Sequence, residues 1–352
     1  MRGRESRRCL LDPRSPGASR RWDPCRTTAW RIIGQSGATS GGGNVKFGAQ
    51  LWPQSTSWPD FADAAIAADQ AGWDSIWTWD HLLAIFGPWE QPIFEGWMTL
   101  TGIAPVTKKV RLGLMVGANT FRNPGLTAKL ATTLDHVSGG RAVLGIGGAW
   151  FEREHDAFGI DFASGVGERL DRLDEAVMLL RRLLDGERFS HAGRFYTFHD
   201  ALCEPRPVQP KLPILVGGSG PKKTLRTTAR YADAWNTSGT VDEVRQKVET
   251  LEAHCADVGR DPKEIERTIS FPIVIRDDAK AAQKALDGLL KHTGAADLNG
   301  VPLLLGSPRQ IADELRPYVE LGFGTMIARL PGPHDRETLA RIGEVDAALG
   351  DA

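Results

Sequence analysis

A histidine and an aspartate stand side by side where a short apolar run ends, in the segment GWDSIWTWDHL. These residues are Asp80 and His81. An imidazole exchanges a proton near neutral pH, and a neighbouring carboxylate can orient or tune a partner, so the pair could serve as an acid–base site. A histidine that only satisfies a strand end would have the same local sequence. The case therefore depends on what the other strand ends carry.

A glycine-rich turn follows another apolar run, in the segment GGSGPKKTLR. The turn consists of Gly217, Gly218, Ser219 and Gly220. Such a turn lets backbone N–H groups face an anion, because glycine adopts backbone conformations that other residues disfavour. A helix that begins at Pro221, with Lys222, Lys223 and Arg226 close by, would add positive potential. The sequence predicts a phosphate site here, and a tight turn with ordinary surface lysines is the simpler alternative.

Further polar residues follow the other predicted strands. They are Gln50, Asn119, Thr120, Arg122, Glu152, Glu154 and Asn236. The charge run that includes Glu152, Glu154 and His155 has the pattern of a solvated helix start, which is the usual role of such a run. Seven of the eleven tryptophans lie between residues 52 and 97. Of these, Trp52 and Trp89 fall in predicted loops and are the best candidates to wall a pocket for a flat ligand.

These residues need elements that bring them together. Short β-rich runs occupy 45–52, 74–80, 110–118, 141–147, 213–218, 233–238, 268–275 and 323–330, with helical patterns such as 59–72, 167–186 and 306–324 between them. This alternation predicts an α/β fold, a (β/α)8 TIM barrel, because a doubly wound sheet usually stops at about five or six strands. In such a barrel the carboxyl ends of the strands converge, and the polar residues named above with them.

Insertions interrupt this alternation at 84–97, 187–211 and 276–305. The segment 187–211 is predicted to form a hairpin and a loop, and 276–305 to be helical at 278–292. Lids of this kind are where selectivity for a substrate would lie.

Composition narrows the function classes. Residues 1–44 hold nine Arg and no Lys against three acidic residues, a net charge of +6, so the remainder carries −7 of the total of −1. An acidic body argues against nucleic acid as a partner. No apolar run approaches the ~18 residues of a membrane span. Four widely spaced cysteines without zinc-site spacing suit a reducing cytoplasm, and no metal site is expected.

The domain organisation is predicted to be simple. Residues 1–44, rich in Arg, Gly and Ser, are expected to form a disordered N-terminal extension, and 45–352 a single domain. An export signal is disfavoured, because no continuous apolar stretch follows either arginine pair of the extension. An over-extended start of translation is an equal alternative for this segment.

Several motifs in the same order resemble the bacterial luciferase-like monooxygenase superfamily, and more closely its branch of probable coenzyme F420-dependent oxidoreductases. The motifs are GWDSIWTWDHL (72–82), the segment 110–150, EREHDAFG (152–159), ILVGGSG (214–220) and YADAWN (231–236). The resemblance implies a luciferase-like TIM barrel that holds a flavin or 5-deazaflavin at the carboxyl ends of its strands.

The resemblance also implies roles for individual residues. It places a non-proline cis peptide bond between Met115 and Val116, in a bulge that supports the cofactor ring. The ring or its ribityl chain would contact Asp80, Asn119, Gly147 and Gly148, and the phosphate would lie at Gly217, Gly218, Ser219 and Gly220. His81 corresponds to a proton donor or acceptor. Trp150 stands where sugar-phosphate dehydrogenases of the branch carry a glutamate. This departure argues against a sugar-phosphate substrate and leaves His81 as the single acid–base candidate.

The leading functional prediction is hydride transfer between coenzyme F420 and a small organic substrate of unknown identity. The alternative is an FMN-dependent monooxygenase that uses O2 and reduced flavin from a separate reductase. A non-catalytic flavin-binding barrel would keep the same cofactor site but have no working acid–base group. A Schiff-base aldolase is disfavoured, because the strand interiors offer no lysine beyond Lys46. Relatives of this kind are often dimers, so a homodimer is compatible with the resemblance.

Overall fold

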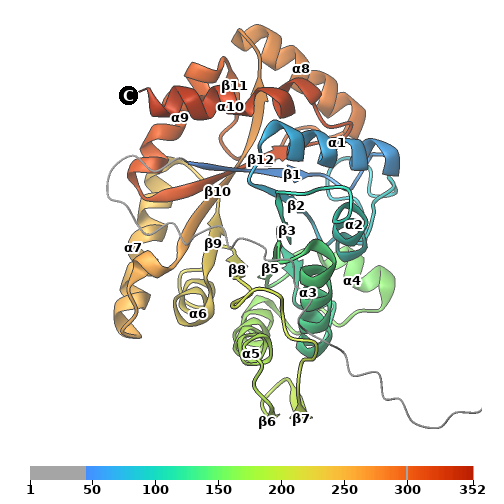
Figure 1. Ribbon diagram of the computed structural model, residues 1–352, viewed down its shortest axis with the longest axis vertical. Helices are drawn as coiled ribbons and strands as arrows, with labels where there is room; N and C mark the ends of the chain where they lie inside the picture. Colours follow the sequence, from blue (N-terminus) through green and yellow to red (C-terminus); the bar gives the residue numbers. More distant parts are fainter. Residues whose placement is uncertain (1–44, 299, 352) are drawn as a thin grey trace, which may run out of the picture. The chain divides into compact units, whose positions relative to one another are not determined.

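The strands of the computed structural model, which describes residues 45–298 and 300–351, close into a barrel (Figure 1). The barrel strands are β1 (Lys46–Leu51), β2 (Ser75–Thr78), β3 (Arg111–Leu114), β5 (Ala142–Gly147), β8 (Ile214–Gly217), β9 (Ala234–Thr237), β10 (Glu266–Ile275) and β12 (Phe323–Leu330). All neighbours pair in parallel, and β10 pairs with both β9 and β12, which closes the ring. The predicted TIM barrel is confirmed. The extension predicted at 1–44 lies outside the described residues.

The third barrel strand is interrupted, so the prediction of one continuous strand at 110–118 is wrong in its middle. Strand β3 ends at Leu114, and the short strand β4 (Gly117–Ala118) then pairs with β5 further along. Between them, Met115 and Val116 leave the ladder and pack against the hydrophobic cluster inside the barrel. The interruption forms a bulge on the inner face of the barrel.

Helices surround the strands (Figure 1). They are α1 (Trp58–Ala71), α2 (Gly96–Ile103), α3 (Pro124–Ser138), α4 (Glu152–Phe158), α5 (Val166–Leu184), α6 (Thr224–Tyr231), α7 (Val241–Asp257), α8 (Ala279–Thr293), α9 (Pro308–Glu320) and α10 (Arg336–Gly350), with a 3-10 turn at Pro262–Glu264. Capping residues fix their ends. For example, Ser57 accepts the N–H of Asp60 at the start of α1, and Gly72, with φ +89°, ends that helix.

Helix α6 begins later than predicted. It starts at Thr224, and Pro221 lies in a preceding turn. The N–H of Leu225 donates to the carbonyl oxygen of Gly220, which folds the turn back onto the glycine loop. Lys223, at the N-cap position, makes no side-chain cap, so the first turn of α6 keeps its N–H groups without a capping side chain.

Two hydrophobic layers hold the barrel. The outer layer lies between strands and helices, where Leu112 and Leu144 are fully buried in one cluster with Val177 and Leu180 of α5. Burying each such side chain stabilises the fold by roughly 1.5–3 kcal/mol. The inner layer fills the barrel and contains Trp77, Val143, Leu215, Ala234 and Ile327. Because this layer closes the barrel axis, a ligand can enter only above it, at the carboxyl ends of the strands.

The insertions lie where the sequence predicted them. The segment 187–211 contains the antiparallel hairpin β6 (Phe189–Ala192) and β7 (Thr197–Ala201), at the lower edge of Figure 1 beside α5. The segment 276–305 supplies α8 and leads into β11 (Leu304–Gly306), which extends the sheet from β10. Helix α8 lies at the upper edge of the same view.

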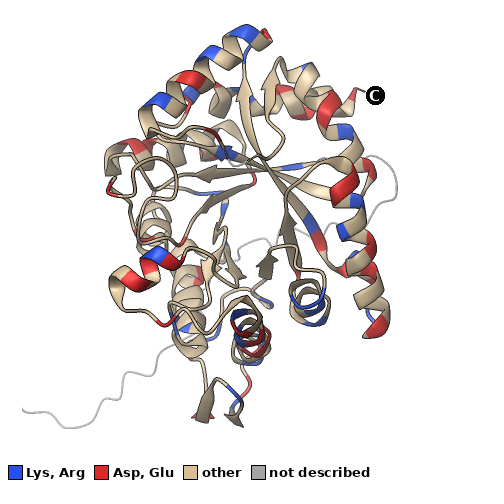
Figure 2. Cartoon of the chain, turned by 180° about the vertical axis from the view of Figure 1, so that it is seen from behind, with Lys and Arg blue, Asp and Glu red and all other residues tan. Residues whose placement is uncertain are grey.

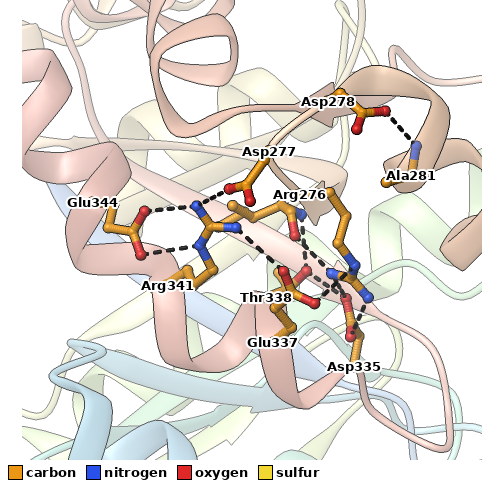
Figure 3. A network of polar contacts seen from close by, with 10 residues as sticks. Arg276, Asp277, Asp278, Ala281, Asp335, Glu337, Thr338, Arg341 and Glu344 are labelled. Atoms are coloured by element: carbon orange, nitrogen blue, oxygen red, sulfur yellow. Dashed lines mark hydrogen bonds and ion pairs between the residues drawn. The ribbon is translucent and has the colours of Figure 1, made fainter.

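Charged residues of both signs are interspersed over the helices, and the strands carry few of them (Figure 2). One network of ion pairs fastens α10 to the end of β10 (Figure 3). In it, Arg276 donates from Nη1 and Nη2 to Asp335 at 2.8 and 2.9 Å, and Arg341 pairs with Asp277 and Glu344.

Among the helices within residues 45–298 and 300–351, none is long and apolar enough to cross a bilayer.

Candidate active site

A cavity of about 540 Å³ opens at the carboxyl ends of the barrel strands. Its walls come from nearly every barrel strand, and Val166 and Leu170 of α5 close one side. A concave, mainly apolar site at this end of a TIM barrel is the usual place for a small-molecule ligand. The residues predicted from the sequence can therefore be judged by whether they reach this cavity.

The bulge in the third strand forms part of the cavity wall. The peptide bond between Met115 and Val116 is cis, as the resemblance implied. Two hydrogen bonds flank it: Met115 N–H donates to the Thr78 carbonyl at 2.7 Å, and Gln50 Nε2 donates to the Met115 carbonyl at 3.1 Å. The bulge is thus tied to β2 on one side and to β1 by a side chain.

Val116 explains why glycines end the neighbouring strands. A Cβ atom on Gly147 would lie 2.8 Å from Cγ2 of Val116, and one on Gly217 would lie 2.7 Å from Cγ1. Both distances are too short for carbon atoms in contact. These two glycines therefore let the bulge approach β5 and β8. All four residues at this point, Met115 included, line the cavity with Gly148.

Asp80 anchors the bulge from the other side. Its carboxylate is buried and accepts the N–H of Ala118 at 2.9 Å and both Nη atoms of Arg122, at 2.6 and 2.9 Å. Arg122 also donates to Glu95 at 2.6 Å. Burial opposes the charge of Arg122, but the hydrogen bonds and attraction from Asp80 and Glu95 outweigh it and raise its pKa. Asp80 lines the cavity and fixes the backbone of β4.

His81 has a carboxylate partner that the sequence did not reveal. Its Nδ1 lies 2.8 Å from Oε1 of Glu154, in the first turn of α4. The other oxygen, Oε2, accepts the N–H of Leu82 at 2.8 Å. Because a carboxylate oxygen accepts, the imidazole donates from Nδ1, and its Nε2 is left to exchange a proton with a ligand. Both side chains line the cavity, with Glu154 only 1% exposed.

The interpretation of the acidic run as a solvated helix start is therefore wrong for two of its residues. Glu154 and the adjacent His155 are both buried, whereas Glu152 is exposed. His155 holds the loop after β4, because its Nε2 and the hydroxyl of Thr120 are 2.7 Å apart. Helix α4 thus turns one polar face inward, and sequence reasoning missed it because a charge run gives no sign of which residues are covered.

The glycine loop reaches the cavity with part of its length. Gly217, Gly218 and Gly220 line the cavity with Thr224, the first residue of α6, and Gly218 has φ +120°. A Cβ on Gly220 would lie 2.8 Å from the Thr224 hydroxyl. The loop and the uncapped first turn of α6 can together receive an anion.

Four predicted side chains do not take the predicted place. Ser219 is turned toward β9, with its hydroxyl 2.8 Å from that of Thr237, and Asn119 donates from Nδ2 to the Tyr196 hydroxyl at 3.2 Å. Lys223 donates to Asp171 at 2.5 Å, so its charge is paired with a carboxylate of α5. Trp89 lies under the guanidinium of Arg153, 4.1 Å from its ring centre. Each of these four side chains contacts a polar or charged group and does not line the cavity.

An aromatic wall completes the cavity. The rings of Trp52 and Phe86 are stacked 4.3 Å apart, and Trp52 meets Trp79 edge-on at 4.6 Å. All three line the cavity, so the prediction for Trp52 is confirmed. Trp79 also reaches the cavity. Its indole N–H finds no partner among the residues that the structure describes.

Comparison with known proteins identifies the family. The family model of the luciferase-like monooxygenases matches residues 39–301. An F420-dependent glucose-6-phosphate dehydrogenase of Kineococcus radiotolerans is 30% identical over 316 residues, which cover 80% of this chain and 90% of the relative. An F420-dependent hydroxymycolic acid dehydrogenase of Mycobacterium tuberculosis is 30% identical over 292 residues, covering 81% and 74%.

Solved structures share the fold. A coenzyme F420-dependent tetrahydromethanopterin reductase from Methanopyrus kandleri superposes with a TM-score of 0.71 at 20% identity, covering 86% of this chain and 98% of that one. An F420-dependent secondary alcohol dehydrogenase gives 0.74 at 20% identity, covering 87% and 99%, and a long-chain alkane monooxygenase gives 0.73 at 16%, covering 87% and 91%. The resemblance drawn from the motifs is confirmed. The chain belongs to the luciferase-like monooxygenase family and is an oxidoreductase of that family.

Proposed function

We propose that this oxidoreductase transfers a hydride between coenzyme F420 and a small organic substrate. The observation that carries the proposal is the His81–Glu154 pair, which faces the same cavity as the bulge at Met115 and Val116. An acid–base group beside a ring-sized shelf suits a reaction in which a hydride and a proton move to or from one substrate. The F420-dependent relatives support the cofactor in this proposal.

The residues present fit a flat cofactor with a phosphate. The bulge, held by Asp80 and Gln50, offers a shelf for the ring, and glycines 147 and 148 keep side chains away from it. The glycine loop and the first turn of α6, with the Thr224 hydroxyl, would hold the phosphate. When bound, the deazaflavin supplies the site that gives or takes the hydride.

The chain's own residues would handle the proton. Glu154 holds His81 by Nδ1, so that Nε2 can give a proton to a substrate oxygen during reduction or take it during oxidation. The aromatic wall of Trp52, Trp79 and Phe86 would exclude water from the reacting atoms. His81 is thus proposed as the catalytic acid or base and Glu154 as its positioning residue.

The alternative cofactor is FMN, with a separate reductase and a monooxygenase reaction. The structural likeness to a long-chain alkane monooxygenase extends to the whole barrel but rests on 16% identity.

The described cysteines, Cys203 and Cys255, are buried and free. Unpaired thiols of this kind support the cytoplasmic location that we include in the proposal.

Titration of the purified protein with F420 and with FMN, each oxidised and reduced and followed by fluorescence, tests the cofactor. We expect micromolar binding of F420. A Gly217→Ala variant should weaken it, whereas Gly343→Ala, where a Cβ meets nothing within 4 Å, should not. Binding of FMN without F420 would favour the monooxygenase, and binding of neither would remove the cofactor proposal altogether.

A further inference from the structure

Among residues 45–298 and 300–351, one guanidinium of the cavity wall has no polar partner. Arg329, near the end of β12, lines the cavity, and it makes no hydrogen bond or ion pair with any residue in the described part of the chain. Burial lowers its pKa to about 10, and no carboxylate of the described residues counters that shift. The group therefore stays protonated at neutral pH. Arg122, by contrast, is half-buried at the same end of the barrel but pairs with two carboxylates.

Arg329 is half-buried, and an unpaired charge that is partly removed from water costs free energy that packing alone does not explain. The neighbouring polar groups do not relieve it. Asn236 and Ser270, which share the cavity wall, hydrogen bond to each other, with Asn236 Nδ2 donating to the Ser270 hydroxyl at 3.1 Å. The partner of Arg329 is therefore expected to come from a ligand.

Two barrel strands, β1 and β2, lie between Arg329 and the bulge that forms the cofactor shelf. Three barrel strands lie between β12 and β5 in either direction, so Arg329 faces the wall that carries Gly147 from across the cavity. His81 follows β2, halfway round between the two. A substrate held by Arg329 and reaching toward the shelf would thus lie beside the acid–base pair.

We propose that Arg329 binds a carboxylate of the substrate, so that the enzyme acts on a small organic acid. A planar guanidinium fork matches a carboxylate with two parallel hydrogen bonds. One unpaired cation balances one negative charge, which favours a carboxylate over the doubly charged phosphate. The inference rests on the proposed function only in that the cavity takes a substrate.

Binding of benzoate and of its neutral counterpart benzamide tests the inference by calorimetry, with and without F420. The wild type should prefer benzoate by about tenfold. Arg329→Met should abolish that preference and leave F420 affinity unchanged, while Arg329→Lys should keep part of it. Arg309→Met, at an exposed arginine on α9, is the matched control and should behave as the wild type.

Thermal unfolding of the same variants adds a second measurement. Arg329→Met should raise the melting temperature, because it removes an unpaired, half-buried charge; a structural arginine would lower it. Equal binding of the two probes by the wild type, a benzoate preference that survives in Arg329→Met, or a lower melting temperature of that variant would overturn the inference. Loss of F420 affinity in Arg329→Met would assign the arginine to the cofactor instead and also overturn it. If the wild type prefers benzoate but does not bind F420, the proposed function fails and the anion site stands.

Discussion

The Nδ1 atom of His81 lies 2.8 Å from Oε1 of Glu154, although 73 positions separate the two residues in the chain. The departure at Trp150 had left His81 without a carboxylate in the sequence comparison. The structure supplies one from α4, four residues further on. Trp150 itself packs edge-on against the imidazole, with ring centres 5.5 Å apart, so it shields the pair.

Replacing either member of this pair should slow the proposed reaction by the same route. We expect His81→Asn to lower turnover by about 10²–10⁴-fold and Glu154→Gln by about 10–100-fold. Because Glu154 acts through His81, the double variant should be no slower than His81→Asn alone. The measurement is oxidation of reduced F420 by the best substrate in a panel of oxo acids, ketones and aldehydes.

Cofactor affinity separates this role from a structural one. Both single variants should bind F420 as the wild type does, since neither residue contributes to the proposed shelf or phosphate site. Multiplicative losses in the double variant would show that Glu154 acts independently of His81. Unchanged turnover in His81→Asn would favour a barrel that binds the cofactor without acid–base chemistry.

The contact between Gly217 and Val116 predicts a compensating pair of substitutions. Gly217→Ala should cost about 1–3 kcal/mol of stability and weaken cofactor binding, because its Cβ would meet both methyl groups of Val116, at 2.7 and 3.0 Å. Val116→Ala removes those methyl groups, so the double variant should regain much of the loss. A urea-unfolding cycle gives the coupling, expected at about 0.5–3 kcal/mol. Additive losses would mean that the bulge does not press on β8.

Much of this fold was predictable because its signals are local. The alternation of β-rich and helical runs marks all eight barrel strands, and polar residues at strand ends identified Asp80 and His81 as cavity residues. Gly147 and Gly217 were also identified, as predicted cofactor contacts, and the structure shows in addition that they make room for Val116. Their importance could be read from the sequence, but the neighbour that requires them could not.

The residues that were missed depend on tertiary placement. Glu154 resembles any acidic residue in a first helical turn until the direction of α4 is known. Arg329 did leave a signal: it alternates with Thr325 and Ile327, so it belongs to the inward-facing set of β12. A basic residue on the inner face of a barrel strand is unusual enough to be singled out, and the run FGTMIARL was taken only as a strand.

The paired hydrogen bonds from Arg122 to Asp80 predict how much the anchoring of the bulge contributes to the free energy of unfolding. Asp80→Asn removes the negative charge from a buried pair and should cost about 3 kcal/mol, because Arg122 keeps only Glu95. Glu95→Gln should cost about 1 kcal/mol, since Glu95 is partly exposed and its charge is screened. Chemical denaturation of both variants at neutral pH gives the two values. Similar losses in both would argue that Asp80 is not the main anchor of Arg122.

His334 predicts how the fold responds to acid. Its ring is buried in the loop after β12 and lies 5.5 Å from the ring of Phe61, and its Nε2 donates to the carbonyl oxygen of Trp52 at 3.0 Å. Burial lowers its pKa to about 4, from about 6.5 in the unfolded chain. Between these values the unfolded state binds the proton more readily. Stability contributed by the neutral ring is therefore complete above about pH 6.5 and declines as the pH falls toward 4, by about 1.4 kcal/mol per unit.

The substitution His334→Asn should flatten this part of the pH dependence. Asparagine tolerates the φ of +61° at this position and keeps an amide donor, so the loop can keep its shape. Urea unfolding at several pH values between 4.5 and 7.5 measures the slope, with His136→Asn, at an exposed histidine, as the control that should follow the wild type. An unchanged slope in His334→Asn would mean that other groups govern the acid response.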